Sequence, residues 1–233
     1  KLTEKKLKAA RMSPGSFSQW RLLRKYEKQK GQLRAGEPSL ENKVTVDLQP
    51  FLHEFDTLLR EAERTAAAAG IDPMAVDFDT CCHSCFQLEL IEAVHLGHSL
   101  NKELSREDRT AAIERAVATT SLLRERETET GFSQEAAAEH LTAAGRLSCP
   151  LLAEESCAIL EHRPLRCRSG IDPVTAARMQ EIVRTASRQV FLALTGEFSP
   201  AADMRFSIFD TVSGRFVQQY FQMMLQNAGD RKS

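Results

Sequence analysis

Apolar residues recur every three to four positions through most of the chain, a spacing typical of α-helices that face a core. Between Pro50 and Gly70 the apolar positions keep this period, with proline suited to the first helical turn and glycine to the residue past the last. From 173 to 195 the pattern is clearer still, because Asp172 is a good N-cap and Gly196 follows the end. The sequence therefore predicts two long helices in these regions.

Shorter helices are predicted between these two. Phe86 to Leu96 should be helical, Ser105 begins a helix with Asp108 placed for a capping box, and Ser133 begins a short Ala-rich helix. The inward face of the helix after Ser105 is predicted to comprise Ile113, Ala116, Val117 and Thr120. The stretch 146–171 is interrupted by proline and is expected to be mostly irregular.

Two further apolar faces lie in the C-terminal part of the chain. The helix over 173–195 is predicted to bury Met179, Ile182, Val183, Ala186 and Val190. Another stripe comprises Phe209, Val212, Phe216, Val217, Tyr220, Phe221 and Met224. This aromatic-rich stripe could receive a partner, but we favour a core helix, because apolar helical stripes usually face a core. The predicted fold class is an irregular all-α domain.

Charge is distributed unevenly along the chain. Residues 1–36 contain eleven Lys or Arg and two Glu, a net charge of +9, whereas the whole chain carries −1. A basic arm of this kind could bind an acidic protein, nucleic acid or an anionic membrane, but we favour a solvated helix that offsets the acidic remainder. No nucleic-acid-binding motif is recognised, so nucleic acid is not an expected partner. We assign residues 1–40 to a basic helical arm and linker, and residues 41–233 to a helical domain.

Length and hydropathy bear on where the protein works. A chain of 233 residues can bury a core without disulfide staples. It contains no apolar run of about 18 residues, so no membrane span is expected. No N-terminal segment resembles a signal peptide. We therefore expect a cytoplasmic protein with reduced or metal-bound thiols, and disulfides are the alternative.

Six cysteines in two tight clusters carry the most specific chemistry of the sequence. The clusters comprise Cys81, Cys82 and Cys85, then Cys149, Cys157 and Cys167. Two groups of three thiols suggest a zinc site or an iron–sulfur cluster that forms a metal-binding core where two distant segments meet. Adjacent Cys81 and Cys82 diverge, so we rank Cys81 last as a ligand. We favour Cys82, Cys85, Cys149 and Cys157, with Cys167 close behind.

The second cluster lies in the segment CPLLAEESCAILEHRPLRCR, which resembles the second half of the YkgJ-like CxxCxxCC family. The matching positions are Cys149, Pro150, Leu152, Cys157, Ile159, Arg163, Pro164, Cys167 and Arg168. Leu160 stands where the family usually has an aromatic residue, and the first cluster keeps only part of the family's repeated C-x-x-C run. The resemblance covers residues 78–170 and implies zinc or iron chelation. Flagellin N-methylases contain a related module, which implies an iron–sulfur-dependent lysine methylase as an alternative.

Other side chains could complete or tune such a site. His83 lies inside the first cluster, His162 lies inside the second, and His95 and His98 are three apart on a predicted helix. We consider His83 the strongest of these candidates and assign the others to ordinary hydrogen bonding. The residues that could offset thiolate charge and donate hydrogen bonds to sulfur are Arg163, Arg166 and Arg168.

Three functions fit these features. The one we favour is a cytosolic metal-binding protein whose cysteines chelate zinc or an iron–sulfur cluster. The second is a protein-modifying enzyme with an iron–sulfur cluster and an adenosyl cofactor, as the resemblance implies; no G-x-G-x-x-G loop is present and no catalytic residue can be named. The third is an adaptor that binds acidic partners through residues 1–36, with a purely structural metal. Cys82 and Cys85 also fit a C-x-x-C redox pair, although the βαβ context of that motif is absent.

Overall fold

The computed structural model describes residues 46–72, 81–131, 133–154, 156–168, 172–196 and 204–230. The chain divides into two units, Lys1–Val46 and Asp47–Ser233, and the account below concerns the second unit. The basic arm and linker predicted over residues 1–40 lie outside the described residues, as does the predicted boundary with the helical domain. Both stay predictions.

Helices dominate the described part of the chain, which is 71 % helical with seven α-helices, so the predicted all-α fold class is confirmed. The helices are α3 (Gln49–Ala68), α5 (Leu90–Glu103), α6 (Arg106–Thr130), α7 (Gln134–Ala143), α8 (Pro173–Thr195), α9 (Ile208–Val212) and α10 (Arg215–Asp230). The antiparallel strand pairs are β1 (Gln87–Glu89) with β4 (Arg205–Ser207), and β2 (Leu152–Ala153) with β3 (Ser156–Cys157). Two 3₁₀ helices follow β3, namely η1 (Leu160–His162) and η2 (Leu165–Cys167).

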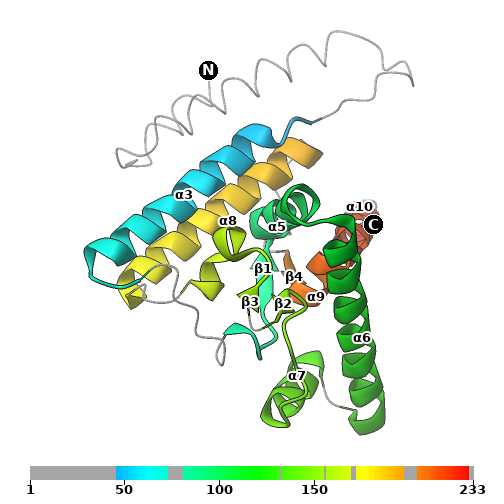
Figure 1. Cartoon of the computed structure of the whole chain (residues 1–233). Helices are drawn as coiled ribbons and strands as arrows, with labels where there is room; N and C mark the ends of the chain where they lie inside the picture. The colour runs from blue at the N-terminus through cyan, green and yellow to red at the C-terminus, as the bar shows by residue number, and fades with distance from the viewer. Residues whose placement is uncertain are drawn as a thin grey trace. The chain divides into compact units, whose positions relative to one another are not determined.

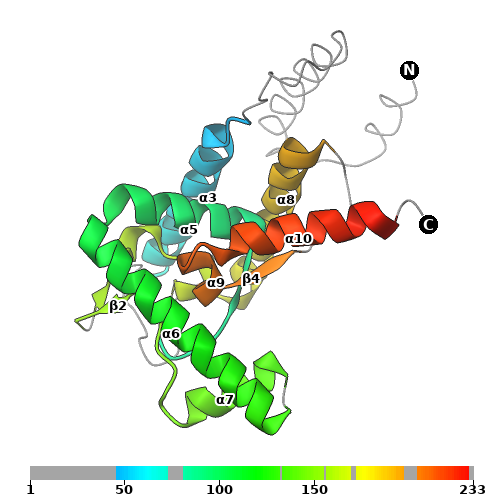
Figure 2. The ribbon, with the colours of Figure 1, turned by 90° about the vertical axis from the view of Figure 1, so that its right-hand side faces the viewer.

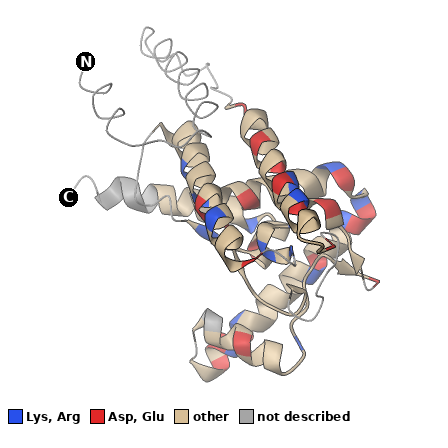
Figure 3. Ribbon diagram, turned by 90° about the vertical axis from the view of Figure 1, so that its left-hand side faces the viewer, with Lys and Arg blue, Asp and Glu red and all other residues tan. Residues whose placement is uncertain are grey.

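The long helices α3 and α8 pack side by side and run antiparallel, and α5 contacts both of them (Figure 1). Helix α6 packs against α9, and α7 lies beside the C-terminal end of α6 (Figure 2). Acidic and basic residues are mixed along α3 (Figure 3). The apolar core lies where α5, α8, α9 and the β1–β4 pair meet, around the fully buried Leu88, Phe206 and Phe209.

Helix ends follow the local signals of the sequence. The Ser105 hydroxyl accepts a hydrogen bond from the backbone nitrogen of Asp108 at 3.1 Å, which satisfies a free donor at the start of α6. The Asp172 carboxylate likewise accepts from the first turn of α8. Gly131 and Gly196 end these two helices with φ of 67° and 76°, a left-handed conformation that favours glycine. The helix predicted over 173–195 is confirmed with the same bounds.

The segment predicted as a helix from Phe86 to Leu96 is helical only from Leu90, so the prediction is wrong for its first four residues. Residues 87–89 form β1, which pairs with β4 so that Leu88 lies opposite Phe206 in the core. Glu89 then caps α5, because its side chain and that of Glu92 form a reciprocal capping box. The partner strand is distant in sequence, so the local pattern could not show the pairing.

Four of the predicted apolar positions are exposed rather than inward, namely Val117, Ile182, Val217 and Phe221. Val117 on α6 is 47 % exposed and Ile182 on α8 is 45 % exposed; buried Ala112 and Ser187 lie on the core-facing sides of these helices instead. The C-terminal stripe is divided between α9, which is buried, and α10, on which Phe221 is 59 % exposed. None of the described helices combines the length and the apolar composition that a membrane crossing requires.

Candidate metal centre

The first cysteine segment is tied to the second through the backbone. The Cys149 nitrogen donates a hydrogen bond to the carbonyl oxygen of Cys82 at 2.6 Å. Beside it, the Nδ1 atom of His83 lies 3.0 Å from the carbonyl oxygen of Leu147. Downstream of Cys82, the carbonyl oxygen of Phe86 accepts from the nitrogen of Ile208, which anchors the segment on α9. Residues more than sixty positions apart are therefore held side by side.

The second segment folds back on itself so that its cysteines face the same way. Cys149 begins a turn in which its carbonyl oxygen accepts from Leu152, and the β2–β3 hairpin then places Cys157 opposite Leu152. Glu154 in the hairpin has φ of 48°, one residue before the part of the turn that lies outside the described residues. Pro164 begins the short turn to Cys167, whose nitrogen donates to the Pro164 carbonyl oxygen. The described residues of the stretch 146–171 are mostly irregular, as predicted, apart from this short hairpin and the two 3₁₀ helices.

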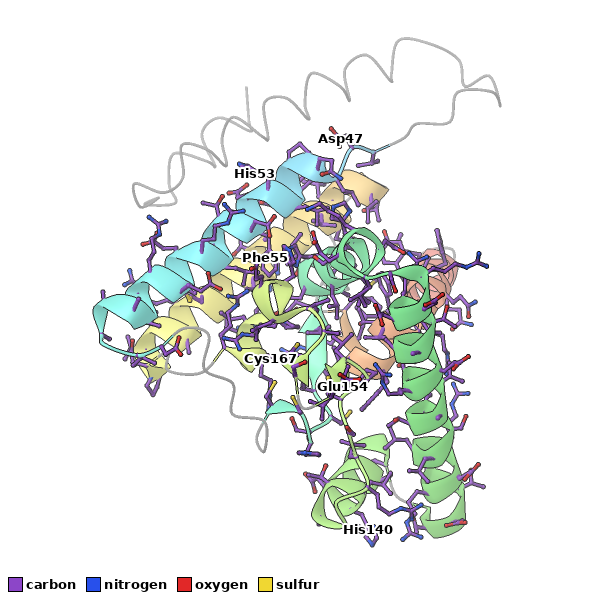
Figure 4. All side chains as sticks on the ribbon, viewed as in Figure 1. Asp47, His53, Phe55, His140, Glu154 and Cys167 are labelled. Atoms are coloured by element: carbon purple, nitrogen blue, oxygen red, sulfur yellow. The ribbon has the colours of Figure 1, made fainter. Side chains whose placement is uncertain are left out.

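Five of the six cysteines line one small buried cavity between the two segments. They are Cys81, Cys82, Cys149, Cys157 and Cys167. The cavity has a volume of about 10 Å³, roughly the room that one water molecule occupies. Apolar residues and Arg163 form the rest of its wall. Figure 4 shows sulfur atoms gathered in the region of the labelled Cys167. The structure thus brings the two predicted clusters together.

Cys85 is not among the residues that line this cavity. It lines a different cavity, of about 440 Å³, together with Ser84, Gln87 and residues of α7. Cys81, which the sequence ranks last as a ligand, lines the cysteine cavity instead, and Cys85, which it ranks among the first, does not. Cys82 and Cys85 line different cavities, and the C-x-x-C redox pair stays a prediction. None of the six cysteines, all of which lie in the described residues, forms a disulfide.

Burial and crowding disfavour the ionised form of these thiols. Burial raises the pKa of Cys149 to about 12. Burial also raises the pKa of Cys82 to about 12, with further contributions from Cys81 and Cys149. The pKa of Cys167 is raised first by its hydrogen bond with Cys81 and then by burial. Thiolates here need a cation to share their charge, which is the behaviour expected of residues that bind a metal in exchange for protons.

Three arginines predicted to tune the site occupy different places. Arg163 is 1 % exposed and lines the cysteine cavity, where its positive charge opposes the effect of burial on the pKa of Cys157. Arg168 is buried and donates to the carbonyl oxygens of Glu161 and Arg163, and it pairs with the Glu63 carboxylate. Arg166 is exposed, with its guanidinium 5.9 Å from the centroid of the Phe86 ring. Of these three arginines, Arg163 is the one that lines the cysteine cavity.

Two of the four candidate histidines belong to a separate group with Asp56. The possible ligand atoms of Asp56, His95 and His162 all lie within 4.8 Å of one another, and no trio of described cysteines meets this spacing. Sulfur atoms around one zinc ion lie about 3.8 Å apart. The sulfur atoms around the cavity therefore have to move closer to one another to bind such an ion. His98 is half-buried and does not join the group. Sequence reasoning named His95 and His162 separately and missed Asp56, for which no local signal exists.

Comparisons with protein-family models, with curated proteins and with solved structures return no match to this chain. The resemblance to the YkgJ-like CxxCxxCC family therefore rests on the motif residues themselves, and its implications remain expectations.

Proposed function

We propose that this protein binds zinc or an iron–sulfur cluster through cysteine thiolates from residues 81–82 and 149–167. The observation that supports this proposal is that five thiols, none of them in a disulfide, line one buried cavity. Thiolate ligands suit zinc and iron–sulfur clusters and disfavour magnesium and calcium, which prefer oxygen. Four cysteines complete either kind of site, and five line the cavity.

Metal binding would have a structural consequence in this chain. The two cysteine segments are irregular and depend on a few backbone hydrogen bonds for their placement. A metal that joins them supplies folding free energy, because its ligands are far apart in the unfolded chain. Arg163 would offset part of the negative charge of the thiolates, since two of four thiolate charges remain when zinc is bound. Such a centre fits a reducing, cytoplasmic location, which forms part of the proposal.

The test is metal and sulfide analysis, with an absorption spectrum, on full-length protein purified without oxygen. About one zinc per chain and no colour would support a zinc centre. Iron with acid-labile sulfide and visible absorption would support the cluster and favour the enzyme that the family resemblance implies. Protein that contains neither metal and takes up neither on reconstitution would overturn the proposal.

A further inference from the structure

A second group of metal-binding side chains lies outside the cysteine cavity. Asp56 comes from α3, His95 from α5 and His162 from η1, so three elements converge on one point. The Asp56 Oδ1 atom lies 2.7 Å from His95 Nε2 and 4.0 Å from His162 Nδ1. The two imidazole centroids are 5.8 Å apart. Phe55, labelled on α3 in Figure 4, is the neighbour of Asp56 in sequence.

These distances bracket the separation that a bound ion imposes. Metal–nitrogen and metal–oxygen bonds of about 2.1 Å at angles of roughly 90–110° place ligand atoms about 3.0–3.4 Å apart. To bind an ion, the 2.7 Å distance between Asp56 and His95 has to lengthen, and the 4.0 Å distance between Asp56 and His162 has to shorten. Each change is less than about 1 Å. Rotation of the partly exposed Asp56 and His162 side chains accomplishes both changes. Their side chains are 30 % and 25 % exposed.

The third ligand is held firmly. The His95 side chain is 4 % exposed, and its ring packs edge-on against Phe55 with centroids 5.1 Å apart. A rigid buried histidine with two adjustable partners is a practical arrangement for binding an ion without rearranging the backbone.

A nearby carboxylate is placed to orient His162. The Glu103 Oε1 atom lies 3.6 Å from Nε2 of His162, on the opposite side of the ring from Asp56. A small rotation makes this a hydrogen bond, which leaves the Nδ1 lone pair directed toward Asp56. Metal-binding histidines commonly donate their other N–H group to a carboxylate in this way, which fixes the tautomer and raises the basicity of the ligand atom.

The group opens on one side to a cavity. Asp56 and His162 line a space of about 320 Å³, together with Arg60, Glu63 and Arg168. We propose that Asp56, His95 and His162 bind one divalent ion of the zinc or iron(II) class, and that its remaining coordination positions face this cavity. Two histidines and one carboxylate with open positions suit both ions, which there hold water or a small ligand. This proposal goes beyond the thiolate centre and shares no ligand with it.

The test uses full-length protein with its thiolate centre loaded, dialysed against buffered free Zn²⁺ and analysed for metal per chain. The wild-type protein should bind about one equivalent more than the thiolate centre holds. Asp56→Asn and His162→Gln should lose that equivalent, with affinity weakened roughly 100-fold. His98→Gln, on the same helix as His95, should keep it.

A second measurement separates the two centres. Cobalt(II) bound by thiolates gives an intense charge-transfer absorption, whereas cobalt bound by His and Asp does not, so the thiolate signal should be unchanged in Asp56→Asn and His162→Gln. Equal metal content in these variants and in the wild type would overturn the proposal. An equal loss in His98→Gln would also overturn it. Absence of the thiolate signal from every protein would instead count against the proposed function.

Discussion

The Cys149 backbone nitrogen donates to the Cys82 carbonyl oxygen across a 2.6 Å hydrogen bond, although 67 positions separate the two residues. This bond places one cysteine from each cluster beside the same cavity without any help from an ion. The contact between His83 and the carbonyl oxygen of Leu147 supports the same junction. Metal binding at the proposed centre would then mainly require the sulfur atoms to move closer to one another, because the backbone already brings the segments together.

The different positions of Cys81 and Cys85 give a matched pair of variants. We assign Cys81 to the four ligands, because it lines the cavity and interacts with both Cys82 and Cys167. Cys81→Ser should therefore lower the metal content of the purified protein and weaken metal binding roughly 100-fold. Cys85→Ser should leave both quantities unchanged, because Cys85 lines another cavity. The measurement is metal per chain after dialysis against a competing chelator. A loss of metal in Cys85→Ser with full binding in Cys81→Ser would reverse the assignment.

Removal of the metal should loosen the cysteine segments more than the helical core. Hydrogen exchange at the Cys149 amide should accelerate by more than about tenfold after chelation, because the metal no longer joins the two segments. Amides in the middle of α8, around the fully buried Val183 and Val190, should change little. Exchange measured by mass spectrometry on loaded and metal-free protein checks this. Uniform acceleration over both regions would show that the metal supports the whole fold rather than this junction.

Local signals predicted the helices well, because caps and glycine ends act within one turn. Ser105, Asp172 and Gly196 show this, since each ends or begins a helix where the sequence places it. The pairing of Leu88 with Phe206 could not be predicted, because strand partners more than a hundred residues apart share no local pattern.

In the candidate sites, too, local patterns were predictable and contacts between distant residues were not. Thiol chemistry predicted one metal site shared by the two cysteine clusters. Five of the six cysteines line one cavity, but no three of their sulfur atoms lie within 4.8 Å of one another, so the metal site stays a prediction. The turn after Cys81 and the start of β1 decide which cavity each thiol lines, so spacing alone could not show that Cys81 rather than Cys85 lines the cysteine cavity. Asp56 was missed for a similar reason, because its partners His95 and His162 come from two other elements.

Arg163 and Arg166 form a second matched pair. Arg163→Met removes a buried positive charge beside the thiols and should weaken metal binding by roughly 10- to 100-fold. Arg166→Met removes an exposed charge that lies over Phe86, and should change affinity by less than about threefold. Competition with a chromogenic chelator measures the metal affinity of both variants. Equal effects of the two substitutions would show that net charge matters rather than the position of Arg163.

Glu92 should make the stability of the protein fall as the pH rises. Burial raises its pKa to about 7, although its carboxylate oxygens accept hydrogen bonds from the nitrogens of Glu89 and Leu165. Between the usual pKa of 4.5 and about 7, the unfolded chain is ionised at this residue while the folded chain keeps its proton. The folded state therefore binds more protons, and the free energy of unfolding decreases with increasing pH, by about 3 kcal/mol in total for a shift of this size.

The substitution Glu92→Gln isolates this effect, because every other titrating group, including any metal-bound thiolate, is common to both proteins. Glutamine offers one acceptor oxygen to two backbone donors, so the variant should be less stable than the wild type at about pH 5. By about pH 8 the difference in the free energy of unfolding between the two proteins should narrow or reverse, since only the wild type carries the cost of a buried charge. Urea unfolding across this range measures the gap, and Glu114→Gln on the exposed side of α6 is the control. A gap that widens with rising pH would mean that the two backbone donors outweigh burial and hold the carboxylate ionised.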